Sequence, residues 1–163
     1  MTEESRALEV LVGELLVRQK GTLAIAESCT GGLITHRLTN VPGSSEYLVA
    51  GVIAYAYEAK VAALGVTWET LNAFGAVSEE TARAMAHGVR AKFGSTLGLA
   101  GTGIAGPGGG MPGKPVGLTF IAVADEAGDR VERHVWQGDR IQNKEKSAQA
   151  ALNLLKEYLQ ARV

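Results

Sequence analysis

One cysteine, Cys29, is the only thiol in a chain of 163 residues, so no internal disulfide can form. The three histidines stand far apart, which leaves no pair at the spacing of a zinc site. Lysine and arginine together (16) nearly balance aspartate and glutamate (17), and so small a net charge argues against binding of nucleic acid. No apolar run is long enough to span a bilayer, and no signal peptide is recognisable at the amino end. We therefore expect a cytoplasmic protein that binds no metal, no nucleic acid and no membrane.

The length is that of one ordinary domain, and we expect residues 1–163 to form a single unit that buries about two-thirds of its extended surface. Apolar residues recur at helical spacing in three longer stretches, residues 4–19, 79–93 and 141–160. Short β-rich runs separate or follow them, at residues 22–26, 49–55, 97–100, 116–124 and 130–136. Strands that alternate with helices and end in a hairpin predict an α/β fold, a three-layer α/β/α sandwich with a mixed central sheet.

A glycine-rich loop, GTGIAGPGGGMPGKPVG at residues 101–117, holds three of the four prolines. It contains GxGxxG, but Pro107 prevents the helix that a dinucleotide site needs after the third glycine. It also contains GxxxxGK, but Pro115 replaces the hydroxyl residue of a phosphate-binding P-loop. Bare backbone N–H groups favour a loop that wraps a phosphorylated or carboxylated small molecule. A tight structural connection is the alternative interpretation.

The turn ESCTGG, residues 27–32, joins a predicted strand to a predicted helix. Small residues and two glycines before a helix are typical of an anion site, because free N–H groups point outward there. Many such turns only close the chain, and this interpretation stays open beside the first.

Ser45, Tyr55 and Lys60 form the most interesting group for nucleophilic catalysis. Lys60 would serve as a base if burial lowered its pKa by about three units from the ordinary value near 10.4, at a cost of roughly 4 kcal/mol. Tyrosine and lysine at a strand-to-helix junction are also common surface residues, so the spacing alone does not decide.

Four blocks carry a family resemblance: AESCTGG at 26–32, PGSSEYLVAGVIAYAYEAK at 42–60, GAVSEETARAMAHG at 75–88 and TGIAGPGGGMPGKPVG at 102–117. In this order they resemble the signature blocks of the CinA carboxy-terminal domain family, which includes the nicotinamide mononucleotide deamidases. The resemblance implies a metal-free, cofactor-free amidohydrolase of pyridine nucleotide recycling. Its substrate would be nicotinamide mononucleotide, and its products nicotinate mononucleotide and ammonia.

The resemblance also implies roles for particular residues. Ser45, the second serine of GSS, is similar to the family's nucleophile, and Tyr55 and Lys60 resemble its activating partners. Positions that resemble substrate contacts are Thr30, Gly31, Gly32, Thr102, Gly103 and Arg140, the last for a phosphate or a carboxamide. A homodimer or higher homo-oligomer is expected from the family.

The roles implied for Ser45, Tyr55 and Lys60 require that these three side chains lie close together. A straight strand over residues 49–55 would separate Ser45 from Tyr55 by roughly 20 Å at ~3.3 Å per residue. We therefore expect a bend at Gly51, a fold-back before the strand, or a site completed by a second subunit.

The sequence leaves open one rival nucleophile and one rival function, and it departs from the family pattern beside the lysine. Cys29, before a helix amino terminus, is a rival nucleophile. A non-catalytic nucleotide-binding or interaction module of the CinA type is a rival function. Ala56 and Tyr57 replace the Ser-Asn pair that the family usually has beside the lysine, which puts the substrate in doubt more than the fold.

Overall fold

A five-stranded sheet runs through the middle of the protein in this computed structural model, which describes residues 6–162. The strands are β1 (Leu23–Glu27), β2 (Leu48–Ile53), β3 (Leu97–Gly103), β4 (Leu118–Ala124) and β5 (Asp129–Val135). Their order in the sheet is β2-β1-β3-β4-β5. β1 pairs in parallel with β2 and β3, whereas β4 pairs antiparallel with β3 and β5. The mixed sheet expected from the sequence is confirmed.

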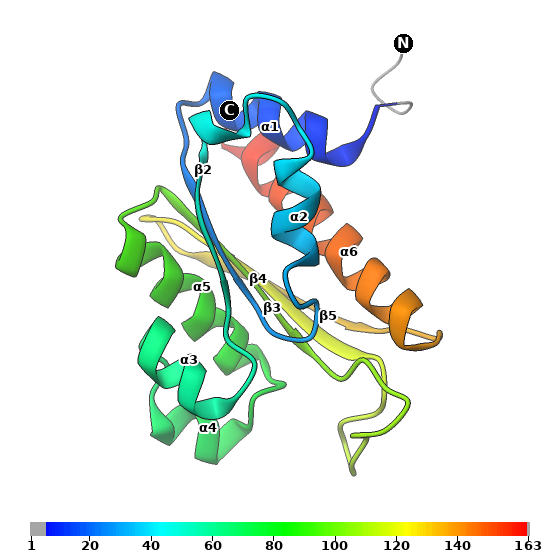
Figure 1. Cartoon of the computed structure of the whole chain (residues 1–163). Coiled ribbons are helices and arrows are strands. Elements are labelled where there is room, and N and C mark those ends of the chain that lie inside the picture. Colours follow the sequence, from blue (N-terminus) through cyan, green and yellow to red (C-terminus); the bar gives the residue numbers. More distant parts are fainter. Residues whose placement is uncertain (1–5, 163) are drawn as a thin grey trace.

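Helices cover both faces of this sheet (Figure 1). On one face lie α1 (Leu8–Arg18), α2 (Leu33–Thr39) and α6 (Arg140–Ala161); on the other lie α3 (Tyr57–Leu64), α4 (Trp68–Phe74) and α5 (Glu79–Phe93). Each face has its own apolar core, because side chains alternate between the faces along every strand. The three-layer α/β/α arrangement is confirmed.

Two glycines let α5 approach its neighbours closely. A Cβ on Gly98, in β3, would lie only 2.0 Å from the carbonyl oxygen of Ala86 in α5. A Cβ on Gly88, in α5, would lie 1.9 Å from the carbonyl oxygen of Leu64 at the end of α3. No side chain fits at either position, and α5 therefore anchors α3 close to the sheet.

Some boundaries differ from the sequence prediction. β2 ends at Ile53, so Tyr55 follows the strand instead of ending it. β4 starts two residues later than expected, since Gly117 has a left-handed φ of 90° that breaks the strand there. α6 begins at Arg140, and its start is fixed by a capping box in which Asp139 and Gln142 bond each other's backbone. Within residues 6–162 no helix combines the length and apolarity needed to cross a membrane.

Candidate active site

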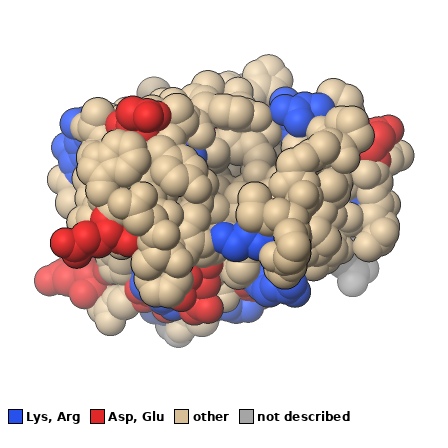
Figure 2. Space-filling view, turned by 90° about the horizontal axis from the view of Figure 1, so that it is seen from below, with Lys and Arg blue, Asp and Glu red and all other residues tan. Residues whose placement is uncertain are grey.

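The segments that leave the carboxyl ends of the parallel strands meet at one edge of the sheet. The turn after β1 lies beside the end of β3, because the Ser28 N–H donates to the Gly101 carbonyl. The segment after β2 joins them through the Ala54 N–H, which donates to the Glu27 carbonyl. Crevices at this edge of an open α/β sheet are common ligand sites. Figure 2 looks at the molecule from this side and shows a hollow near the middle with basic side chains beside it.

Lys60 is the most unusual residue at this edge. Its side chain is fully buried, and its amine lies 3.0 Å from the Ser28 hydroxyl, 2.8 Å from the Ala54 carbonyl and 2.9 Å from the Tyr55 carbonyl. Burial lowers the pKa of Lys60 from 10.5 to about 8, because a desolvated ammonium is disfavoured relative to a neutral amine. The lowered pKa predicted for a catalytic base is thus present.

Ser28, and not Ser45, is the hydroxyl beside Lys60. Ser45 is exposed and lies in the 3₁₀ helix η2 (Ser44–Glu46), just before β2 begins, whereas Lys60 follows the end of β2. The six residues of β2 span about 20 Å at ~3.3 Å per residue, and the strand runs on through Gly51 without ending. Neither the bend nor the fold-back that we expected brings Ser45 to Lys60 within one chain.

Within a single chain, the structure thus separates Ser45 from Lys60 and does not bring the two side chains together. The hydroxyl that lies beside Lys60 belongs to Ser28, which is largely buried, with 7% of its surface exposed. A site centred on Ser28 needs no residue from a second subunit, and the geometric reason for expecting an oligomer no longer applies.

The turn that carries Ser28 is held by a buried carboxyl group. Glu27 is fully buried and accepts four hydrogen bonds: from the hydroxyls of Thr30 (2.6 Å) and Thr35 (2.7 Å), and from the N–H groups of Ile34 (2.9 Å) and Thr35 (3.0 Å). Glu27 thus occupies donors in the first turn of α2. The N–H groups of Ile34 and Thr35 are therefore not free to bind an anion, and the Thr30 side chain is engaged in the fold.

The backbone of the same turn still offers donors. Among residues 6–162, no backbone carbonyl accepts from the N–H groups of Cys29, Thr30 or Gly32. Gly31 and Gly32 have left-handed φ values of 60° and 102°, a conformation that glycine adopts without strain. The N–H groups of Cys29 and Thr30 thus follow Ser28 directly in the chain and have no backbone acceptor among the described residues.

Tyr55 and Arg140 form the opposite rim. Arg140 donates one hydrogen bond to the Tyr55 hydroxyl (3.1 Å) and one to the Gly106 carbonyl (2.7 Å). Tyr55 contacts Lys60 through its backbone carbonyl alone, while its ring is 57% exposed. Tyr55, which the resemblance makes an activating partner of the serine, thus has no hydrogen bond from its hydroxyl to Lys60, and that hydroxyl bonds Arg140 instead.

Thr102 and Gly103 shape the floor beneath the turn. The Thr102 hydroxyl is buried and donates to the Ala76 carbonyl at 2.8 Å. A Cβ on Gly103 would lie 2.7 Å from the Thr119 hydroxyl and 3.2 Å from the Cys29 sulfur. Both residues lie in β3, which continues to Gly103 and so takes in three residues that the sequence had placed in the glycine-rich loop; the Thr102 side chain is already engaged with the fold.

The structure also bears on Cys29, the rival nucleophile, and on Tyr57, which differs from the family pattern. Burial raises the pKa of the Cys29 thiol to about 11, so the thiolate that a cysteine nucleophile needs is absent near neutral pH. Tyr57, one of the two residues that differ from the usual family pair beside Lys60, accepts a hydrogen bond from the Ala76 N–H at 3.2 Å. Its ring lies 6.5 Å from that of Trp68. Tyr57 therefore packs against α4 and supports the segment that holds Thr102.

A groove of about 390 Å³ opens beside the turn, between the start of α2 and the first turns of α6. The turn residues Thr30, Gly31 and Gly32 form one wall, and Ile141 and Lys144 form the other. The groove therefore adjoins the segment that carries Ser28 and offers room for a small molecule.

The comparisons with known proteins agree with one another. A family model described as "CinA C-terminal domain" matches residues 5–159. A CinA-like protein of Chloroherpeton thalassium is 53% identical over 158 residues, which cover 94% of this chain and 38% of the relative. A putative competence-damage inducible protein of Moorella thermoacetica is 50% identical over 154 residues, 94% of this chain and 37% of the relative. The chain thus spans less than two-fifths of the length of these relatives.

Solved structures show the same fold. The competence damage-inducible protein A (ComA) from Klebsiella pneumoniae superposes with a TM-score of 0.90 at 33% identity, covering 93% of this chain and 94% of that one. The competence/damage inducible protein CihA from Agrobacterium tumefaciens superposes with a TM-score of 0.86 at 37% identity, covering 98% and 99%. By sequence and by fold, the chain belongs to the CinA C-terminal domain family.

Proposed function

We propose that this chain is a metal-independent amidohydrolase that converts nicotinamide mononucleotide to nicotinate mononucleotide and ammonia, in the recycling of pyridine nucleotides. One observation carries the proposal: a fully buried lysine amine lies 3.0 Å from a serine hydroxyl, at the edge of the sheet where the parallel strands end. The choice of substrate rests on the resemblance of the sequence blocks to nicotinamide mononucleotide deamidases.

The surroundings of Lys60 suit a neutral amine. A neutral amine has two N–H donors and one lone pair, and Lys60 has two carbonyl acceptors, on Ala54 and Tyr55, and one hydroxyl neighbour, on Ser28. With both N–H groups donated to the carbonyls, the lone pair is left for the Ser28 proton. Lys60 then serves as the general base that activates the serine.

The reaction proceeds through an acyl-enzyme. As Lys60 takes the proton, the Ser28 oxygen attacks the carboxamide carbon, and the carbonyl oxygen becomes an oxyanion that the N–H groups of Cys29 and Thr30 stabilise. The C–N bond breaks, and the ammonium of Lys60 returns its proton to the leaving nitrogen, which departs as ammonia. Water then attacks the ester with Lys60 again as base, releasing the carboxylate product and restoring the Ser28 hydroxyl.

The direct test incubates the purified chain with nicotinamide mononucleotide in the presence of EDTA and measures nicotinate mononucleotide and ammonia. Ser28→Ala is run beside Ser45→Ala, a matched substitution at the exposed serine. We expect product from the wild type and from Ser45→Ala, and a loss on the order of 10³-fold or more with Ser28→Ala.

Other outcomes would change the assignment. Turnover by Ser28→Ala together with loss in Ser45→Ala would return the nucleophile to Ser45 and require a second subunit. Binding of the mononucleotide without any turnover would contradict catalysis and favour a non-catalytic nucleotide-binding module.

A further inference from the structure

Lys144, on the second turn of α6, stands over the glycine turn of the candidate site. Its amine lies 3.8 Å from the position that a Cβ on Gly31 would occupy. The side chain is half-buried and lines the groove beside the turn. Over residues 6–162, no carboxylate lies within ion-pair distance of this amine and no acceptor within hydrogen-bond distance. A half-buried cation left without an anion is open to an anionic ligand.

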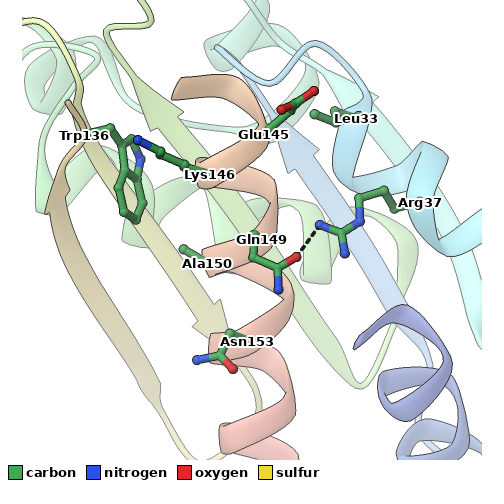
Figure 3. A pocket seen from close by; sticks show the side chains of 8 residues that line it. All are labelled: Leu33, Arg37, Trp136, Glu145, Lys146, Gln149, Ala150 and Asn153. Carbon is green, nitrogen blue, oxygen red and sulfur yellow. Dashed lines mark hydrogen bonds between the residues drawn. The ribbon is translucent and has the colours of Figure 1, made fainter. Parts of the chain in front are cut away.

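The neighbouring basic side chains already have hydrogen-bond partners within the protein. Arg37 donates to the carboxylate of Glu9 and to the side chain of Gln149, and the second of these bonds is drawn in Figure 3. Arg140 bonds Tyr55 and the glycine-rich loop, as described above. Lys146, two residues beyond Lys144, donates to the Gln137 carbonyl at 3.2 Å. Among these basic residues around α2 and the first half of α6, Lys144 is the one that faces the groove with its amine uncommitted.

The shape of the wall beneath Lys144 fits a compact anion. Gly31 and Gly32 present no side chains to the groove, so an anion can approach the backbone closely. Gly32 also has an N–H group that no backbone carbonyl of residues 6–162 accepts. One carboxylate, that of Glu145, lines the groove as well; it is exposed, and water and salt screen its repulsion.

We propose that Lys144 binds the phosphate of the substrate against the Gly31-Gly32 backbone and thereby selects a mononucleotide over its nucleoside. The identity of the nucleotide rests on the function proposed above, whereas the phosphomonoester site rests on the position of Lys144 alone. In this arrangement Ser28 reacts with the carboxamide end of the ligand, and Lys144, which stands over Gly31, holds the charged end.

The test compares nicotinamide mononucleotide with nicotinamide riboside, which lacks the phosphate. Lys144→Gln is expected to lower the ratio of kcat/KM for the mononucleotide to kcat/KM for the riboside by at least about tenfold, since a charge-assisted contact is lost. Most of the change should appear in the KM for the mononucleotide. Lys146→Gln, the matched control two residues away, should keep the wild-type ratio, and Lys144→Arg should restore much of it. An unchanged ratio in Lys144→Gln would overturn the proposal while leaving the deamidase function standing.

A second measurement does not depend on turnover. Binding of ribose 5-phosphate to the whole chain is followed by calorimetry or by ³¹P NMR, for the wild type and both lysine variants. Binding that Lys144→Gln weakens at least about tenfold and Lys146→Gln preserves would support the phosphate site, even if no amide were hydrolysed. Equal binding by all three proteins, or no binding by the wild type, would overturn it.

Discussion

The amine of Lys60 lies 3.0 Å from the hydroxyl of Ser28, although the two residues are 32 positions apart in the sequence. The parallel pairing of β1 with β2 explains the contact. Glu27, the last residue of β1, pairs with Ile53, the last residue of β2, so the segments that follow the two strands begin side by side. Ser28 is the first residue after β1, and the segment after β2 leads directly into α3, which carries Lys60.

The activity should depend on pH through Lys60. Because burial lowers its pKa to about 8, the neutral amine that acts as base is the minor form at pH 7. We expect kcat/KM to rise about tenfold per pH unit below this pKa and to level off above it, with an apparent pKa near 8. Lys60→Met should lose activity at every pH, while Lys92→Met, at an exposed lysine on α5, should keep the wild-type profile. A wild-type profile that is flat from pH 6 to 9 would contradict the role of Lys60 as base.

The same residue links stability to pH. Burial lowers the pKa of Lys60 to about 8 in the folded protein from its ordinary value of 10.5, so between these values the unfolded chain binds more protons than the folded one. The free energy of unfolding contributed by this group therefore rises with pH across that window, by about 3 kcal/mol in total, and is constant below it. Urea unfolding at pH 7.5, 9 and 10 should show this rise in the wild type relative to Lys60→Met. Parallel curves for the two proteins would show that the folded-state pKa is not lowered.

Tyr55→Phe separates the two ways in which Tyr55 contacts the site. The backbone carbonyl that holds Lys60 survives the substitution, and only the hydroxyl that accepts from Arg140 is lost. We expect kcat to fall less than about tenfold, with a larger change in KM, since a single rim hydrogen bond is removed. Tyr158→Phe, near the other end of α6, serves as a control. A loss as large as that of Lys60→Met would show that the phenol takes part in proton transfer.

Cys29 should be dispensable. Its thiol is buried, and its pKa is raised to about 11, so it reacts slowly with iodoacetamide at pH 8. Cys29→Ala keeps the backbone N–H that we place in the oxyanion hole, and we expect its kcat to stay within a few-fold of the wild type. Steady-state kinetics of Cys29→Ala beside Ser28→Ala checks this, and comparable losses in the two variants would make the thiol the nucleophile.

The sequence predicted the order of strands and helices because each element carries a local signal of periodicity, capping or glycine content. It also predicted that the segments around Lys60, Thr102 and Arg140 would share one site. It did not identify Ser28, because the contact with Lys60 depends on which strands are neighbours and in what register, and neither is encoded locally. The signal that could have found it was a serine directly after a short strand whose first four residues are apolar, at the edge where parallel strands end.

The expected meeting of Ser45 and Lys60, which lie on either side of one strand, is not found within one chain. Ser45 and Lys60 are close in sequence, but an extended strand between them carries them to opposite ends of the sheet. The buried Glu27 was likewise not recognised, since a carboxyl group that accepts four hydrogen bonds from a turn and a helix has no signature in the sequence of the turn itself.

Glu27 should matter for both folding and activity. Glu27→Ala leaves two N–H groups and two hydroxyls without their acceptor in a buried place, and we expect the free energy of unfolding to fall by about 3 kcal/mol or more. Glu27→Gln has the same shape, but its amide nitrogen must face a donor, so the loss should be smaller. Because the turn positions Ser28, kcat of the folded Glu27→Gln protein should fall as well. Urea unfolding and steady-state kinetics measure the two effects, with Glu58→Ala, at an exposed glutamate on α3, as control. Glu27→Ala with the stability of the wild type would show that the turn holds without its buried carboxyl group.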